Sequence, residues 1–186
     1  MEWLDQLDVE CLHGDILSVE AQAVACNVNI MMSLNYRLGQ QVGARCGPEL
    51  ASDLDAIRNT LPDGQLGLGS AITTPAYHLG RTEQLILFAW WGEDNEFTPQ
   101  FIYKCLSNIF REALKLRVES LALPLFGTGS HGMRLQDLAT QIVGVLQDFD
   151  RLKNSQNFSL KALHLCSDKS RDIAYLDEYI MGQLWR

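Results

Sequence analysis

Four short segments of the chain are almost continuously apolar, and they limit its possible folds more than any other feature. These segments are residues 21–28, 84–91, 120–126 and 160–166. An uninterrupted apolar run is typical of a β-strand that is covered on both faces, since neither face keeps polar side chains for water. Strands of this kind occur in parallel sheets, where helices cover both sides.

Weaker patterns predict the remaining elements. Residues 7–16 alternate in polarity like a further strand, and residues 69–80 are typical of a hairpin leading into the second apolar run. Apolar residues recur at helical spacing over residues 34–47, 102–116, 135–149 and 170–185. Gly47 ends the first of these helices, and we expect Pro48 to act as a stop just beyond it.

Strands that alternate with helices predict an α/β sandwich around a largely parallel sheet. The chain has 186 residues, which is enough to bury a sizeable core. It contains no internal repeat, low-complexity tract or linker. We therefore expect one domain over residues 1–186.

The charge balance restricts the possible partners. The chain carries 15 Lys and Arg against 23 Asp and Glu, a formal net charge of −8. This balance argues against an extended basic surface for nucleic acid or an anionic membrane, but it permits a small anionic ligand in one pocket. The four His and five Cys show no ligand spacing, so no metal is implied.

The cysteines and the first residues predict a location. Five scattered cysteines without a C-x-x-C pair are typical of reduced thiols in a cytosolic protein. The first ten residues lack the apolar segment of a signal peptide, and no apolar run approaches the about 18 residues of a membrane helix. We expect a soluble, cytoplasmic protein that does not enter a membrane.

A glycine-rich loop follows the third apolar run. Residues 127–132 read G-T-G-S-H-G, between a predicted strand and a predicted helix. The glycine spacing matches a Rossmann-type NAD-binding fingerprint, but Asp148 and Asp150 stand at a helix end instead of the strand end that this fold requires. An ordinary P-loop is excluded, because Met133 and Arg134 replace its Lys and Ser/Thr.

Two interpretations of this loop are favoured over the Rossmann-type NAD-binding one. Consecutive small residues at a helix N-terminus expose backbone N–H groups, which bind a diphosphate without a cationic side chain. Alternatively, the glycines serve only a tight strand-to-helix turn that needs positive φ.

Further motifs occur in order before this loop. Gly14-Asp15-Ile16 forms a turn, the first apolar run ends at Asn29, and G-P-E-L stands at residues 47–50. Together with residues 124–132, they resemble the macro domain family, the ADP-ribose-binding α/β/α module. The likeness covers about residues 12–168. It implies a three-layer α/β/α sandwich with a central mixed, largely parallel sheet.

The resemblance also implies site residues. Asp15 would accept a hydrogen bond from the adenine amine, the Ile16 backbone N–H would serve a ring nitrogen, and Asn29 would reach the distal ribose. From the sequence alone, a cap is the favoured explanation of Asp15, and Asn29 is equally explained as a residue that bonds its own turn. The loop that would bind the diphosphate and distal ribose consists of Gly127, Thr128, Gly129, Ser130, His131, Gly132 and Met133.

The chain departs from the family in the first phosphate loop. The glycine run of hydrolytic members is replaced by Leu34-Asn35-Tyr36-Arg37, and Gly39 stands where the catalytic acid is expected. Gly39 has no side chain to activate a water. Cys26 replaces the first asparagine of the family's strand-end pair, next to Asn27. Arg37 is either a direct cationic contact to a phosphate or a solvated residue at a helix start.

We therefore expect a module that binds ADP-ribose, free or attached to a protein, without a further cofactor. The alternative is a hydrolase of ADP-ribosyl or O-acetyl-ADP-ribose linkages, with Asn29 as the catalytic residue and a water activated by the ligand's phosphate. A third possibility is that the altered first loop no longer admits ADP-ribose, which leaves another nucleotide or a structural role.

Overall fold

The computed structural model describes residues 3–92, 97–128, 132–152 and 158–185. Within these ranges the strands form one sheet in the order β1-β6-β5-β2-β4-β3. All neighbouring strands are parallel except β3, which runs antiparallel to β4. The strands are β1 (Asp8–His13), β2 (Ala23–Asn29), β3 (Ala71–Pro75), β4 (Gln84–Trp91), β5 (Ser120–Pro124) and β6 (Ala162–Ser167). The predicted mixed, largely parallel sheet is confirmed.

Helices connect the strands. The α-helices are α1 (Arg37–Cys46), α2 (Pro48–Arg58), α3 (Pro99–Leu116), α4 (Leu135–Leu152) and α5 (Ser170–Leu184). Short 3-10 turns occur at η1 (Leu4–Gln6), η2 (Ile16–Ser18) and η3 (Pro62–Gly64). No helix in the described ranges has the length and apolar character needed to span a membrane.

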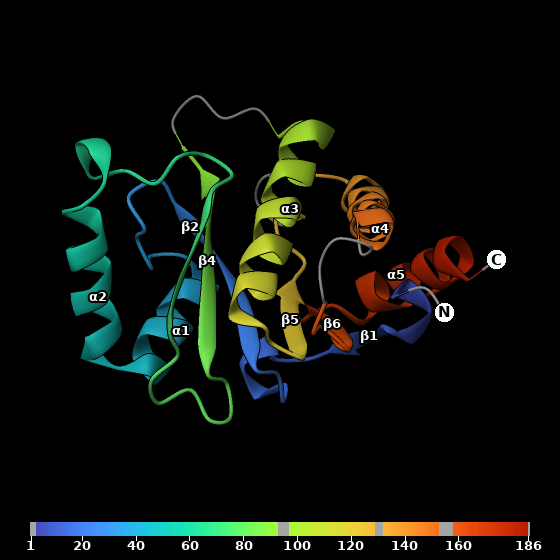
Figure 1. The fold of residues 1–186 in the computed structure, drawn as a ribbon, viewed down its shortest axis with the longest axis horizontal. Helices are drawn as coiled ribbons and strands as arrows, with labels where there is room; N and C mark the ends of the chain where they lie inside the picture. The colour runs from blue at the N-terminus through green and yellow to red at the C-terminus, as the bar shows by residue number, and fades with distance from the viewer. Residues whose placement is uncertain (1–2, 93–96, 129–131, 153–157, 186) are drawn as a thin grey trace.

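The sheet separates two hydrophobic cores, as the apolar runs predict. Helices α1 and α2 cover one face of the sheet, and α3, α4 and α5 cover the other (Figure 1). Alternate residues of β4 enter opposite cores: Ile86 and Phe88 belong to the core under α3, whereas Leu85 and Leu87 belong to the core under α1 and α2. All four are fully buried. The strand has no polar face because both faces are covered.

The predicted end of the first helix is confirmed, since α1 ends at Cys46 and Gly47 caps it. Pro48 is the first residue of α2, a helix that the sequence pattern did not indicate. Proline is compatible with this position because the first N–H of a helix needs no partner within the helix. The chain turns between α1 and α2 at Gly47, with φ 88° and ψ −176°, a conformation that is essentially restricted to glycine.

The strand order creates a crevice at one edge of the sheet. β2 and β5 are neighbours, yet the chain leaves β2 toward α1 on one face and leaves β5 toward α4 on the other. The connections therefore diverge beyond the carboxyl ends of these two strands. In open α/β sheets, crevices at such a switch point are where ligands bind.

Candidate ligand-binding site

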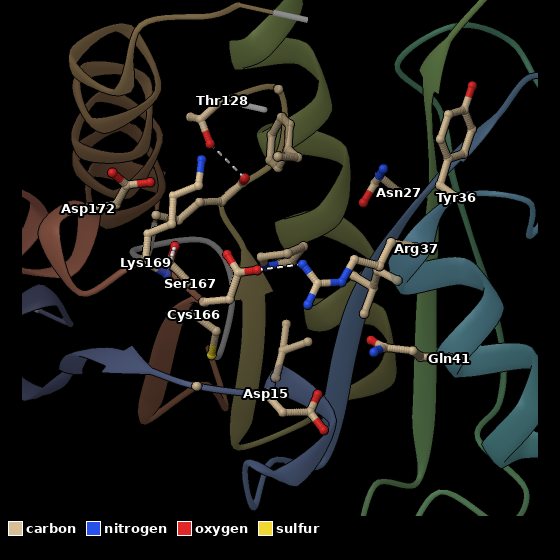
Figure 2. A pocket seen from close by; sticks show the side chains of 18 of the residues that line it. Asp15, Asn27, Tyr36, Arg37, Gln41, Thr128, Cys166, Ser167, Lys169 and Asp172 are labelled. Carbon is tan, nitrogen blue, oxygen red and sulfur yellow. Dashed lines mark hydrogen bonds and ion pairs between the residues drawn. The ribbon is translucent and has the colours of Figure 1, made fainter. Parts of the chain in front are cut away.

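A cavity of about 690 Å³ lies at this switch point. Its walls come from the turn after β1, the end of β2 with the start of α1, the end of β4, the loop after β5, and the segment from the end of β6 to the start of α5 (Figure 2). The volume lies within the range of small-molecule sites. Among the residues that the structure describes, no group of three or more His, Cys, Asp or Glu is placed to hold a metal ion.

Asp15 lines one end of the cavity and has several partners. One carboxylate oxygen accepts from the Leu17 N–H at 3.0 Å, and the other accepts from the Ser18 hydroxyl at 3.2 Å and from Arg45 at 2.5 Å. Asp15 therefore caps η2, as the alternative interpretation proposed. A carboxylate offers about four acceptor positions, so three partners leave roughly one for a ligand.

The electrostatic environment keeps Asp15 ionised. Burial by itself raises the pKa of Asp15, but the hydrogen bonds from Leu17 and Arg45, together with the Arg45 charge, lower it below its ordinary value of 3.8. Ile16, the next residue, also lines the cavity and starts η2, where a backbone N–H has no partner within the turn. The pair therefore presents one acceptor and one donor side by side.

The two asparagines of β2 have different positions. Asn27 lines the cavity, whereas Asn29 is not among the lining residues. The side-chain oxygen of Asn29 accepts from the Ser33 N–H at 2.8 Å. The pairing of β2 with β4 shifts register between Val28 and Asn29, so simple alternation along the strand does not hold there. Cys26 is fully buried.

The loop after β5 forms another wall. Gly127 and Thr128 line the cavity, and the Thr128 hydroxyl donates to the Leu125 carbonyl at 3.2 Å. Gly127 has φ 80°, and a Cβ there would lie 2.5 Å from the Trp90 ring, so only glycine fits. Gly132 and Met133 are not lining residues. The predicted ligand residues Gly129, Ser130 and His131 lie outside the described part of the chain.

The first loop is packed tightly against α1. A Cβ on Gly39, which is buried in α1, would lie 2.9 Å from the Leu34 Cα and about as close to the Leu34 carbonyl. The loop is also tied to α2, because Arg58 donates to the Met31 carbonyl at 3.1 and 3.2 Å. Leu34 therefore occupies the space that an acidic side chain at position 39 would need.

Arg37 extends across the cavity from α1. Its guanidinium pairs with Asp168 at 2.7 Å, and the two side chains are 79% and 55% exposed. Asp168 directly follows β6, so the pair joins opposite walls (Figure 2). Arg37 starts α1 and is largely exposed, as one alternative holds, and it also lines the cavity; its contact to a phosphate stays a prediction.

Several lining residues were not predicted from the sequence. Trp90 is 1% exposed, and it both packs in the core and lines the cavity. Tyr36 and Gln41 come from the α1 side, and Lys169 and Asp172 from the β6–α5 side. Such positions can be sought in the sequence among the residues that follow each predicted parallel strand, because the carboxyl ends of parallel strands meet at one edge of the sheet.

Comparisons with known proteins agree with this architecture. A family model described as Macro domain matches residues 24–142. The Oceanobacillus iheyensis macrodomain with ADP superposes with a TM-score of 0.82 at 18% identity, covering 96% of this chain and 93% of that one. A variant of the same macrodomain with ADPR gives 0.81 at 17% identity, over 98% and 97%. The Trypanosoma brucei macrodomain in complex with ADP gives 0.78 at 16%, over 93% and 69%. At these identities the structural likenesses establish the fold.

Adding a methyl group at Gly39 is expected to destabilise the protein. Alanine normally stabilises a helix relative to glycine by about 0.5–1 kcal/mol, but overpacking against the Leu34 backbone costs about 1–3 kcal/mol. Gly39→Ala should lower the free energy of unfolding in urea. Gly144→Ala in α4 is the matched control, because a Cβ there meets nothing within 4 Å, and it should be neutral or stabilising. Equal effects at both positions would contradict the packing described for Leu34.

The charge on Asp15 is expected to stabilise the fold at neutral pH and to lose this effect in acid. Because the pKa of Asp15 is lowered on folding, its contribution is present above pH 3.8 and is lost as the pH falls through the folded value. Asp15→Asn should therefore be less stable than wild type at pH 7, by less than about 1 kcal/mol for so exposed a pair. Urea unfolding at pH 7, 5 and 3 should show the difference in free energy of unfolding between wild type and Asp15→Asn become smaller at the lowest pH. A difference that stays constant would exclude a charge effect.

Proposed function

Because the chain belongs to the Macro domain family, we propose that it binds ADP-ribose, either free or attached to a protein. The observation that carries the proposal is that Asp15–Ile16 and Gly127–Thr128, predicted for the two halves of the ligand, line one cavity. They are far apart in the sequence, after β1 and after β5, and they line the same cavity at the switch point of the sheet. The similar macrodomains that contain ADP or ADPR support the same ligand class.

The adenine is proposed to bind at Asp15. The carboxylate has about one acceptor position left, and an adenine amine is a donor that fits it. The Ile16 N–H would donate to a ring nitrogen beside it. A base with a carbonyl at the amine position would place two acceptors against each other. This arrangement therefore selects adenine over hypoxanthine.

The diphosphate is proposed to bind over the ends of β5 and β2. The Gly127–Thr128 backbone lies there, close to where the chain turns toward α4. Backbone N–H groups of such a loop bind phosphate oxygens without a cationic side chain. Lys169 on the β6 side adds a positive charge to this part of the cavity (Figure 2).

Binding without hydrolysis is the function that these features favour. Gly39 supplies no acid, and the Leu34 backbone fills the adjoining space. Asn29, proposed as the catalytic residue of the hydrolase alternative, uses its side-chain oxygen to hold Ser33 and is not among the cavity residues. Asn27 is the asparagine of β2 that lines the cavity, and it would contact a ribose hydroxyl. The hydrolase alternative thus lacks a supporting observation at this site.

Titration calorimetry with ADP-ribose tests the binding proposal directly. Wild-type protein should bind ADP-ribose saturably and prefer it to the inosine analogue. Asp15→Ala should weaken ADP-ribose binding by roughly tenfold or more, because a hydrogen bond to a charged group is lost, and it should reduce the preference for adenine. Asp63→Ala, outside the cavity lining, is the control. Unchanged adenine selectivity in Asp15→Ala would contradict the role given to this carboxylate.

A turnover assay separates a binding protein from a hydrolase. Incubation with a protein ADP-ribosylated at acidic residues should release no ADP-ribose above the buffer rate, although the same preparation binds ADP-ribose. Asn29→Ala should lower stability by disturbing the Ser33 contact, with affinity reduced less than in Asn27→Ala. Catalytic release that Asn29→Ala abolishes would establish the hydrolase alternative instead.

A further inference from the structure

The ion pair between Arg37 and Asp168 crosses the cavity from the α1 wall to the β6 wall. Arg37 is the first residue of α1, and Asp168 follows β6 directly. In Figure 2 the Arg37 side chain reaches away from α1 toward the opposite wall, between Asp15 on one side and Thr128 on the other. A ligand that extends from Asp15 to Thr128 must therefore pass this guanidinium.

The pair is weak enough for a ligand to displace it. Both side chains are more than half exposed, and exposed ion pairs contribute little because water screens them. A diphosphate offers the guanidinium two adjacent oxygens and more charge than one carboxylate, a geometry that arginine binds well. Exchange of Asp168 for a phosphate therefore costs little and gains a stronger contact.

The charges around the cavity favour a cationic contact to an anionic ligand. Among the described lining residues, the acids are Asp15, Asp168 and Asp172, and the permanent cations are Arg37 and Lys169. The whole chain carries a formal charge of −8. An anionic ligand thus enters a negatively charged protein beside three carboxylates. If Arg37 left Asp168 without contacting the ligand, neutral backbone donors alone would not compensate the repulsion between the Asp168 carboxylate and the anionic ligand.

We propose that Arg37 is a phosphate-binding residue that exchanges partners, pairing with Asp168 in the structure described and with the ligand's diphosphate in the complex. Asp168 is then a competitor that lowers the affinity and holds the arginine in reach of the cavity. This inference rests on the proposed function. It makes Arg37 a determinant of specificity for ligands with a diphosphate over adenosine, in a loop where the sequence has lost its glycine run.

Calorimetry on four proteins tests the exchange: wild type, Arg37→Gln, Asp168→Asn and the double variant, each with ADP-ribose, ADP and adenosine. Arg37→Gln should weaken ADP-ribose and ADP binding by roughly tenfold or more, the effect of losing a charge-assisted contact. Asp168→Asn should tighten both by about two- to fivefold, the value of an exposed pair. Adenosine binding should change little in either variant.

The double variant isolates the contact between Arg37 and the ligand. It should bind ADP-ribose roughly tenfold or more weakly than Asp168→Asn alone. Equal affinities of these two proteins would show that Arg37 only neutralises Asp168, and would overturn the proposal. Single variants that change affinity in the same direction would indicate a structural latch, and would also overturn it.

A matched pair elsewhere controls for general charge effects. Arg81 and Glu20 are paired at 2.8 Å with similar exposure, 78% and 71%, and neither lines the cavity. Arg81→Gln and Glu20→Gln should leave all affinities unchanged, and thermal melts should confirm that every variant is folded. Failure of wild type to bind ADP or ADP-ribose at millimolar concentration would reject the proposed function together with the exchange. If wild type binds these ligands and the Arg37 and Asp168 variants bind them with the same affinity, the exchange alone is rejected.

Discussion

The separation of the connections after β2 and β5 is the constraint on which the site depends. Two neighbouring parallel strands end at the same edge, but their chains turn to opposite faces of the sheet. The space between them cannot be filled by either connection, so backbone and side chains from both line a crevice. The turn after β1 and the segment after β6 close its sides, because these strands end at the same edge. The cavity thus follows from strand order before any particular side chain is considered.

Much of the fold could be predicted because strands buried on both faces appear in the sequence as continuous apolar runs. The apolar runs became β2, β4, β5 and β6, and the helical spacings became α1, α3, α4 and α5. α2 was missed because Pro48 was interpreted as an end, whereas the geometry of Gly47 allows a new helix to begin at once. A proline after a helix-ending glycine is compatible with a loop and with the start of a new helix. Here the tertiary packing of Leu50 and Leu54 favours the helix.

The site could be predicted only where a local motif fixes it. Asp15 and Gly127 stand in short motifs that the family resemblance supplied; both line the cavity, and Asp15 also serves as a cap. Asn27 was passed over in favour of Asn29, since a register shift between neighbouring strands leaves no mark in a single strand's sequence. The Arg37–Asp168 pair joins residues 131 positions apart, so nothing short of the folded topology could reveal it.

α1 is fastened at both ends to the opposite wall of the cavity. Arg45, in its last turn, holds Asp15, and Arg37, at its first residue, holds Asp168. The Arg45–Asp15 pair is the less exposed of the two, with side chains 42% and 35% exposed against 79% and 55%, so α1 stays anchored at its last turn when Arg37 is released. The proposed adenine and phosphate contacts would therefore form at two ends of a helix that need not move as a whole. The free energies that the base and the diphosphate contribute to binding would then be close to additive.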